Sequence, residues 1–359
     1  MKHLVIRNLG PLKEADVELK RINVIIGSQS SGKSCVLKTA CYCTWVEKRI
    51  ELTQTADFFA KDGNFLKELE RFHKLQGYIK GDTFISYESD FMAFSYDNTT
   101  KTFRFEWKQD RWNYRRSKVS YIPAERNLVA VIPNWFQVKF SNNNILDFMA
   151  DWSQARYYAV ESMPVLNLGV SYHYNYGSKT DEVWISDKEK LDFINTSSGL
   201  QSLIPLFVHL NYILHNETSS DYDSLESKEE QLAVMSALRE VDMVELYPNY
   251  MQTHFCDIFL EEPEENLFPP TQSSLVDWMI EGVKGGKQGS RYNQPSNLFI
   301  ATHSPYILNA FMEKQDIDIT LLYTKTTEGQ ITVKTATEED IQAIYDYGVD
   351  AFFNIETLG

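Results

Sequence analysis

The chain has 359 residues, of which 43% are hydrophobic, so it is long enough for a full core and by length alone would allow two or three domains. It carries 50 acidic against 35 basic side chains, a formal net charge of −15. This excess opposes sequence-independent adhesion to nucleic acid, which depends on Lys and Arg neutralising phosphates. Any contact with DNA is therefore expected to be local or supplied by a partner.

The cysteine pattern and the length of the apolar segments indicate in which cellular compartment the protein is expected. The four cysteines form no Cys-x-x-Cys pair and lie in no His cluster at zinc-ligand spacing, which favours free thiols in a reducing compartment; they are Cys35, Cys41, Cys43 and Cys256. No basic segment followed by an apolar stretch begins the chain, and no run of 18 apolar residues occurs in it. We expect a cytoplasmic protein with no membrane partner.

The first elements lead into a glycine-rich loop. Residues 4–12 and 15–19 predict two short strands around the Gly10-Pro11 turn. The apolar run 22–26 then predicts a buried strand, and residues 35–48 predict a helix.

The turn between this strand and this helix fits the phosphate-binding pattern G-x-x-x-x-G-K-[ST]. It reads Gly27-Ser28-Gln29-Ser30-Ser31-Gly32-Lys33-Ser34. Glycines let the backbone fold around an anion, and successive N–H groups with the positive end of the helix stabilise phosphates. We expect Lys33 to reach the β and γ phosphates of a nucleotide and the Ser34 hydroxyl to bind Mg²⁺, because hard cations prefer oxygen ligands.

The middle of the chain predicts alternating β and helical segments. Residues 50–80 are charged and helical in pattern, and residues 83–107 alternate with period two, which predicts an antiparallel meander. The later predictions are a strand ending in a polar turn over 118–127, a helix over 145–161, a hairpin over 170–176 and 183–186, helices over 200–215 and 228–241, strands over 319–324 and 330–335, and a helix over 338–347. The polar stretches 215–224 and 284–290 predict a mobile and a flexible loop.

Two adjacent carboxylates, Glu261 and Glu262, end the apolar strand that begins at Asp257. Phosphoryl transfer depends on positioning and electrostatics. We therefore assign Glu261 to the Mg²⁺ shell and Glu262 to polarising the attacking water. Taken alone, acidic residues after a strand are more often part of a solvated loop.

A second apolar strand, 298–301, ends in the polar turn Thr302-His303-Ser304-Pro305. A histidine at this place can donate a hydrogen bond to a γ-phosphate and help to hold the attacking water. The segment 195–201, which contains Ser197, Ser198 and Gly199, opens a helix. As a helix cap it needs no further explanation, although it also offers hydroxyls and a helix N-terminus to an anion.

Taken in this order, the four motifs resemble those of the ABC-type ATPases, in the branch that includes SMC heads, RecF-like heads and the OLD (overcoming lysogenization defect) family. The resemblance extends from Arg7 to about Tyr323 and implies an α/β P-loop fold with a central, mostly parallel sheet, an antiparallel β subdomain and a helical lid insertion. It implies that the turn at Ser197 is the signature motif, which reaches a nucleotide bound by the other subunit of a dimer. Glu261-Glu262 resembles the Walker B end and catalytic glutamate, Asn266-Leu267 the D-loop region, and His303 the switch histidine.

The resemblance implies ATP and Mg²⁺ as ligands and a composite site. The expected catalytic residues are Lys33, Glu262 and His303, and the expected metal ligands are Ser34 and Glu261. The expected nucleotide-contacting residues are Gly27, Ser28, Gln29, Ser30, Ser31, Gly32, Lys33, Ser34, Cys35, Ser197, Ser198 and Gly199.

Some positions depart from the family pattern. Ser30 stands where a small glycine is common, and Glu261 where many relatives have aspartate, so the hydrolysis rate stays open. No convincing Q-loop glutamine is present; Arg126, in the turn after residues 118–122, is the candidate for coupling nucleotide to a partner surface.

The organisation predicted is one composite domain over 1–359. Its parts are a hairpin and P-loop lobe (1–50), a β and helical insertion (51–195), a signature, Walker B and switch lobe (196–325) and a C-terminal extension (326–359). The insertion contains no long coiled coil, as SMC heads have, and the C-terminal part contains no second acidic cluster of the kind a Toprim nuclease needs. We therefore expect the effector to be a separate chain.

Four functions stay open at this stage. The leading hypothesis is a dimeric ATP-dependent switch that controls a separate nuclease or toxin, similar to the ATPases of the anti-phage systems Septu, PARIS and retron modules. The alternative is a DNA-repair or recombination ATPase that contacts DNA directly through the basic, aromatic segment 108–118. A transporter motor and a non-hydrolysing ATP-bound scaffold are the remaining readings, which copurification with a membrane protein and turnover measurements would test.

Overall fold

A single large sheet organises the chain. The computed structural model describes residues 2–132, 138–159, 161–186, 188–216, 228–284, 294–314 and 317–347. Within them, eleven strands form one sheet in the order β6-β5-β4-β1-β2-β15-β14-β3-β13-β12-β7. The strands are β1 Lys2–Leu9, β2 Leu12–Leu19, β3 Ile22–Ile26, β4 Ile79–Glu88, β5 Met92–Asp97, β6 Thr102–Trp107, β7 Ser117–Ile122, β12 Phe255–Glu261, β13 Asn297–Ala301, β14 Ile319–Thr327 and β15 Gln330–Thr335.

The sheet is parallel at one side and antiparallel at the other. Strands β7, β12, β13, β3 and β14 pair in parallel, and so do β15 and β2. The hairpin β1-β2 and the meander β4-β5-β6 are antiparallel, as the sequence predicts. The meander pairs with β1, so it extends the central sheet instead of forming a sheet of its own.

A smaller antiparallel sheet of four strands, in the order β11-β10-β9-β8, lies apart from the large one. Its strands are β8 Met163–Pro164, β9 Ser171–Asn175, β10 Thr180–Ser186 and β11 Glu189–Asp192. The hairpin expected at 170–176 and 183–186 is confirmed by β9 and β10, with Tyr172 opposite Val183.

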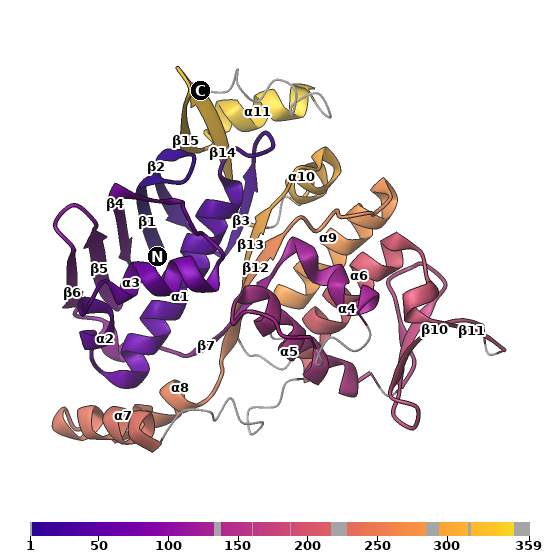
Figure 1. Ribbon diagram of the computed structural model, residues 1–359, viewed down its shortest axis with the longest axis horizontal. Helices are drawn as coiled ribbons and strands as arrows, with labels where there is room; N and C mark the ends of the chain where they lie inside the picture. Colours follow the sequence, from indigo (N-terminus) through magenta and orange to yellow (C-terminus); the bar gives the residue numbers. More distant parts are fainter. Residues whose placement is uncertain are drawn as a thin grey trace.

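Helices cover both faces of the large sheet. Figure 1 shows α1 and α3 beside the indigo strands on the left, and α5, α6 and α9 on the right. The longer helices are α1 Lys33–Thr53, α3 Asn64–Phe72, α5 Asn144–Tyr157, α6 Ser198–Asn211, α7 Lys228–Glu240, α9 Pro269–Val283, α10 Pro305–Met312 and α11 Glu338–Tyr347. The shorter ones are α2 Asp57–Ala60, α4 Leu128–Val131 and α8 Tyr247–Met251, with single turns η1 Arg111–Asn113, η2 Ala124–Asn127, η4 Phe193–Asn195, η5 Tyr212–Asn216 and η6 Val244–Leu246.

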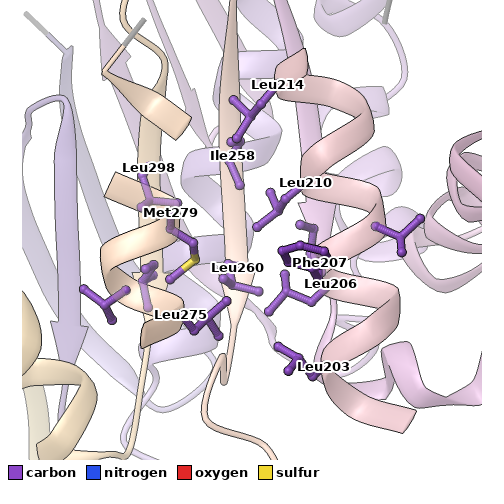
Figure 2. Close-up of a cluster of buried hydrophobic side chains, with 14 of the residues drawn as sticks. Leu203, Leu206, Phe207, Leu210, Leu214, Ile258, Leu260, Leu275, Met279 and Leu298 are labelled. Atoms are coloured by element: carbon purple, nitrogen blue, oxygen red, sulfur yellow. The ribbon is translucent and has the colours of Figure 1, made fainter. Parts of the chain in front are cut away.

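The large sheet has a hydrophobic core on each face, and successive side chains of its buried strands belong alternately to one core and the other. Ile258 and Leu260 of β12 belong to the core that includes α6 and α9, whereas Phe259 points to the other core, which includes α1. This follows from the period of two in a strand. Figure 2 shows Ile258 and Leu260 between α6 and α9, together with Leu298 of β13. On the opposite face the rings of Phe259 and Phe299 stack with centroids 4.4 Å apart.

Some predictions from the sequence differ from the structure, and others fall on residues that the structure does not describe. The helical segment expected over 50–80 contains α2 and α3 but ends in β4, which begins at Ile79. The loops expected at 215–224 and 284–290 lie almost entirely outside the described residues. All four cysteines are buried thiols outside any disulfide. In the described part of the chain, no helix is both long and apolar enough to cross a membrane.

Candidate nucleotide and phosphoryl-transfer site

The loop 27–34 joins buried strand β3 to helix α1, and its glycines are sterically required. A Cβ atom at Gly27 would lie 1.8 Å from Oγ1 of Thr324, and a Cβ at Gly32 would lie 2.5 Å from a methyl of Leu12. Gly32 has φ +86°, the left-handed region, and immediately precedes the first turn of α1. A side chain at either position would collide with β14 or β2, so the backbone path of the loop requires glycine there.

The side chain of Lys33 fills the centre of this loop. Its Nζ donates to the carbonyl oxygens of Gly27 at 2.9 Å and Ser28 at 2.7 Å, and it lies 3.3 Å from Nδ1 of His303. Burial lowers the pKa of Lys33 to about 8, and the charges of two nearby glutamates partly oppose this. The ammonium group has thus lost most of its hydration, and an anion in the loop would compensate that loss.

Glu261 ends β12 beside the first turns of α1. Its side chain is 7% exposed, and its Oε1 lies 3.7 Å from Nζ of Lys38. Lys38 is one helical turn beyond Ser34, so the carboxylate and the Ser34 hydroxyl belong to the same side of α1. Ser34 is partly buried. An oxygen-ligand pair is therefore available there.

Glu262 follows Glu261 in a left-handed backbone conformation, with φ +43°. Its N–H donates to the carbonyl of Ala301 in β13 at 2.9 Å, and its own carbonyl accepts from the N–H of Glu265 at 3.1 Å. This conformation costs a residue with a side chain about 1–2 kcal/mol. Adjacent residues of a strand point to opposite faces, and the left-handed turn redirects the Glu262 side chain away from that alternation.

The Glu262 carboxylate is 43% exposed and lies 3.6 Å from Nε2 of His303. Burial raises the pKa of Glu262, and the negative charges of Glu264, Glu261 and Glu265 raise it further, against the opposing effect of Arg126. The group therefore accepts a proton more readily than an ordinary surface glutamate does.

His303 stands between the lysine and the glutamate. Its Nδ1 faces Lys33 and its Nε2 faces Glu262. Burial lowers the pKa of His303, and the positive charge of Lys33 lowers it further, so the neutral imidazole is favoured. Three of the residues expected to be catalytic thus lie in one row.

Two contributors were not predicted in these roles. Glu264 accepts hydrogen bonds from the Thr302 hydroxyl at 2.8 Å and from the His303 N–H at 2.6 Å, which fixes the turn after β13. Thr324 of β14 donates to the Ser31 hydroxyl at 2.7 Å. The sequence offered a signal for Glu264, since it lies two residues beyond Glu262, but none for Thr324, which is remote along the chain.

The segment expected to be a signature motif is placed elsewhere in the molecule. Ser197 is the N-cap of α6, and its hydroxyl accepts from the Leu200 N–H at 3.4 Å. Figure 1 shows α6 in the right-hand part of the molecule, away from the start of α1. A Cβ at Gly199 would lie 2.9 Å from the carbonyl oxygen of Asn266, so the turn adjoins the segment after β12 in the same chain. Ser197 and Ser198 therefore begin a helix that adjoins the segment after β12 of the same subunit.

The basic segment 108–118 is engaged by the protein itself. Arg111 lies over the rings of Trp107 and Trp112, with its guanidinium carbon 3.5 Å and 4.1 Å from their centroids, and donates to Gln54. Arg116 is fully buried and donates to backbone carbonyls.

Lys108 and Lys118 of the same segment form ion pairs with Glu88 and Asp151. Arg115 is exposed. Four of the five cations are therefore committed to intramolecular contacts, and we do not propose direct binding of DNA through this segment.

No family model matches the chain, and no curated protein matches it. Among solved structures, the SMC head domain from Thermotoga maritima is similar over 93% of this chain and 98% of that chain, with 12% identity and a TM-score of 0.45. The Smc head domain of Pyrococcus furiosus bound to the C-terminal domain of ScpA is similar over 96% and 99%, with 9% identity and a TM-score of 0.44. The Smc head domain of Pyrococcus yayanosii is similar over 96% of this chain and 99% of that chain, with 8% identity and a TM-score of 0.40. These similarities are too low to assign an activity to the chain.

Proposed function

We propose that the chain is a dimeric ATPase that acts as a switch for a separate effector protein. The observation that carries this proposal is the row formed by Lys33, His303 and Glu262, which ends in a phosphate-binding loop at one side and in a carboxylate with a raised pKa at the other. A loop alone fits kinases and other nucleotide-binding proteins as well. The carboxylate and the imidazole beside it fit the attack of water on a terminal phosphate.

In the proposed reaction a water oxygen bonds to the γ-phosphorus and the bond to the β,γ-bridging oxygen breaks, which releases phosphate and ADP. Glu262 takes the proton of the attacking water, and its raised pKa brings it closer to the pH at which a general base works well. Neutral His303 donates a hydrogen bond to the γ-phosphate and orients the water. Lys33 exchanges its carbonyl contacts for phosphate oxygens and stabilises the developing charge.

The donor set fits Mg²⁺. A hard cation of this kind takes one or two protein oxygens, with substrate phosphates and waters as its other ligands. Ser34 and Glu261 are the residues that would hold it, and bound there it would neutralise phosphate charge. Among the described residues no group of three His, Cys, Asp or Glu side chains forms a ready metal site.

The dimer is proposed from the resemblance of the Ser197 turn to a signature motif; Figure 1 shows α6, which this turn begins, in another part of the molecule from α1. In the family whose motifs the chain resembles, the corresponding turn contacts the γ-phosphate held by the other subunit. Closure would then depend on ATP, and hydrolysis through Glu262 would reopen the pair. The resemblance to OLD-like ATPases also supports the finer proposal that the effector is a nuclease or toxin of an anti-phage system.

Three variants test the reaction. Lys33→Ala should abolish ATP binding, and Glu262→Gln should bind ATP, hydrolyse it at least about 100-fold more slowly and accumulate dimers. Glu313→Gln, the same change at an exposed position at the end of α10, is the matched control and should behave as the wild type does. Turnover is measured by phosphate release and dimers by light scattering with ATP. Wild-type turnover in Glu262→Gln would refute the assignment of the base.

The switch is tested separately from the chemistry. The product of the neighbouring gene should copurify with the wild-type chain in a manner that changes between ATP and ADP, and Lys33→Ala should lose this nucleotide dependence. Plaque counts in cells that carry both genes, with and without Lys33→Ala, test the anti-phage setting. Equal plaque counts would remove that setting and leave the ATPase proposal intact.

A further inference from the structure

Arg126 is a buried cation that binds the backbone around the two carboxylates. It belongs to the turn η2 after β7 and is 1% exposed. Its Nη1 donates to the carbonyl of Glu261 at 2.9 Å, and its Nη2 donates to the carbonyl of Glu262 at 2.6 Å. The guanidinium therefore holds the peptide on both sides of the left-handed residue Glu262.

The same guanidinium also reaches the helix that begins at the Ser197 turn. Its Nε donates to the carbonyl of Ser202 in α6 at 3.1 Å. A second link runs from Nδ2 of Asn266 to the Ser202 hydroxyl at 2.9 Å. The close approach of Gly199 to the Asn266 carbonyl is a third. The first two turns of α6 and the segment 261–266 are thus joined at three places.

We propose that Arg126 is a positioning residue that couples the Ser197 turn of a subunit to Glu262 of the same subunit. The inference rests on the proposed ATPase function and deepens it. A contact of the Ser197 turn with a nucleotide across the dimer would shift α6, and Arg126 would pass that shift to the backbone that aims Glu262. Hydrolysis at one ATP site of the dimer would then depend on the other site. The subunit that supplies Glu262 to the first site would have to contact the nucleotide of the second site through its Ser197 turn.

The chemistry of the side chain fits this role. A guanidinium carries its N–H donors in a fixed plane and donates hydrogen bonds to carbonyls in several directions. An ammonium is a compact point charge on a flexible stem. Lysine at this position would keep the positive charge that faces the cluster Glu261, Glu262, Glu264 and Glu265 but would lose the fixed geometry. Arg126→Lys therefore separates geometry from charge.

The test compares Arg126→Lys with Arg116→Lys. Arg116 is the matched control because it is also fully buried and also donates to backbone carbonyls, those of Tyr250 and Met251, at another place in the fold. Arg126→Lys should lower kcat about 100-fold, because small misplacements of a catalytic group have effects of that size, with ATP affinity within about threefold of wild type. Arg116→Lys should lower the melting temperature at least as much and keep kcat within about threefold.

A double-mutant cycle gives a readout that a merely structural role would not move. Glu262→Asp keeps a carboxylate but draws it back by one methylene. If Arg126 acts through Glu262, Arg126→Lys should cost less than about tenfold in the Glu262→Asp background, instead of about 100-fold.

The outcomes separate this inference from the proposed function. Equal kcat for the two lysine variants, a parallel loss of kcat and ATP affinity in Arg126→Lys, or additive effects in the cycle would each overturn the role of Arg126 and leave the ATPase intact. A wild-type chain that binds no ATP or does not turn it over would overturn the ATPase proposal, and with it the role of Arg126.

Discussion

Glu264 holds His303 in place by its backbone: Oε1 of the glutamate accepts from the histidine N–H at 2.6 Å. Its other oxygen accepts from the hydroxyl of Thr302 at 2.8 Å. The carboxylate that fixes the turn after β13 therefore comes from the segment after β12. Because the register places Glu261 beside Ala301, the two strand ends arrive at the same level of the sheet and this contact is short.

Removal of this carboxylate should impair turnover more than ATP binding. Glu264→Ala leaves the His303 N–H and the Thr302 hydroxyl without their acceptor, so the imidazole is no longer held between Lys33 and Glu262. We expect kcat to fall about 10- to 100-fold. Glu264→Gln keeps one acceptor for the N–H and should retain most of the activity. A larger loss in Glu264→Gln than in Glu264→Ala would contradict this account.

The same glutamine variant should change the pH profile. Burial raises the pKa of Glu262, and the charge of Glu264 is the next largest cause. Without that charge the pKa of Glu262 falls, so the base stays ionised to lower pH. The acidic limb of kcat/KM should therefore move to lower pH in Glu264→Gln. A limb that stays in place would mean that Glu262 is not the titrating base.

Binding of ATP should weaken at alkaline pH through Lys33. Burial lowers the pKa of this lysine in the free protein to about 8, and the protonated form is the one that attracts phosphate. Below this pKa the ammonium is present before ATP arrives. Above it, binding must take up a proton, so the Kd for ATP should rise with pH above about 8. Calorimetric titration in two buffers of different ionisation enthalpy measures that proton uptake.

Lys33→Arg is the control for this titration because a guanidinium stays charged over the whole range. Its affinity for ATP is expected to be lower at neutral pH, since its fork does not match the pocket of the two loop carbonyls. Its Kd should nevertheless be independent of pH between 7 and about 10. A pH dependence equal to that of the wild type would assign the titration to another group.

The position where the loop departs from the usual pattern offers a stability test. Ser30 has φ +60°, a left-handed conformation that glycine adopts without steric cost. Ser30→Gly should therefore raise the free energy of unfolding by about 0.5–1 kcal/mol, because relief of strain exceeds the added chain entropy. Ser28→Gly, two residues away and without a positive φ, should lower it by about 0.5–1 kcal/mol. Urea titration measures both, and equal effects would refute the strain argument.

The sequence was most informative where a pattern is local. The loop 27–34, the hairpin β1-β2 and the meander β4-β6 follow from turn residues and periodicity, and their strands and helix are confirmed. The contacts of Arg126 and Glu264 were not predictable, because each depends on which strand ends lie side by side in the sheet. The contacts of Arg111 with an aromatic ring and of Arg116 with a backbone carbonyl likewise depend on tertiary packing. The basic segment 108–118 therefore does not present these two arginines to a partner.

Two buried glutamates on α1, one turn apart, differ in their hydrogen bonds. Glu47 accepts from the hydroxyls of Tyr87 and Ser89, both at 2.6 Å. Glu51 is 0% exposed, and neither of its carboxylate oxygens accepts a hydrogen bond of full geometric quality from the described residues, although the Gln54 side chain is near enough to act on its pKa. Burial raises the pKa of both groups, and for Glu51 the charge of Glu47 adds to this while Arg111 and the Gln54 side chain oppose it. The same substitution should therefore have opposite effects at the two positions.

Glu51→Met should raise the free energy of unfolding at pH 7 by about 1–3 kcal/mol, because it replaces a fully buried carboxyl group, whose burial is poorly compensated, by an apolar side chain of similar volume. Glu47→Met should lower it by about 2–4 kcal/mol, because two buried hydroxyls lose their acceptor.

The sign of the pH dependence follows from the raised pKa of Glu51. A carboxyl whose folded-state pKa exceeds its unfolded value favours folding below the unfolded pKa, and this contribution is lost as pH rises through the folded value. The wild type has this loss and Glu51→Met does not, so the advantage of the variant should grow as pH rises from about 4. Urea titrations at several pH values measure it. An advantage that is constant with pH would show that the pKa of Glu51 is the same in the folded and unfolded states, which would contradict the raised folded-state pKa. A destabilised Glu51→Met would show that the interactions of the carboxyl outweigh the cost of its burial.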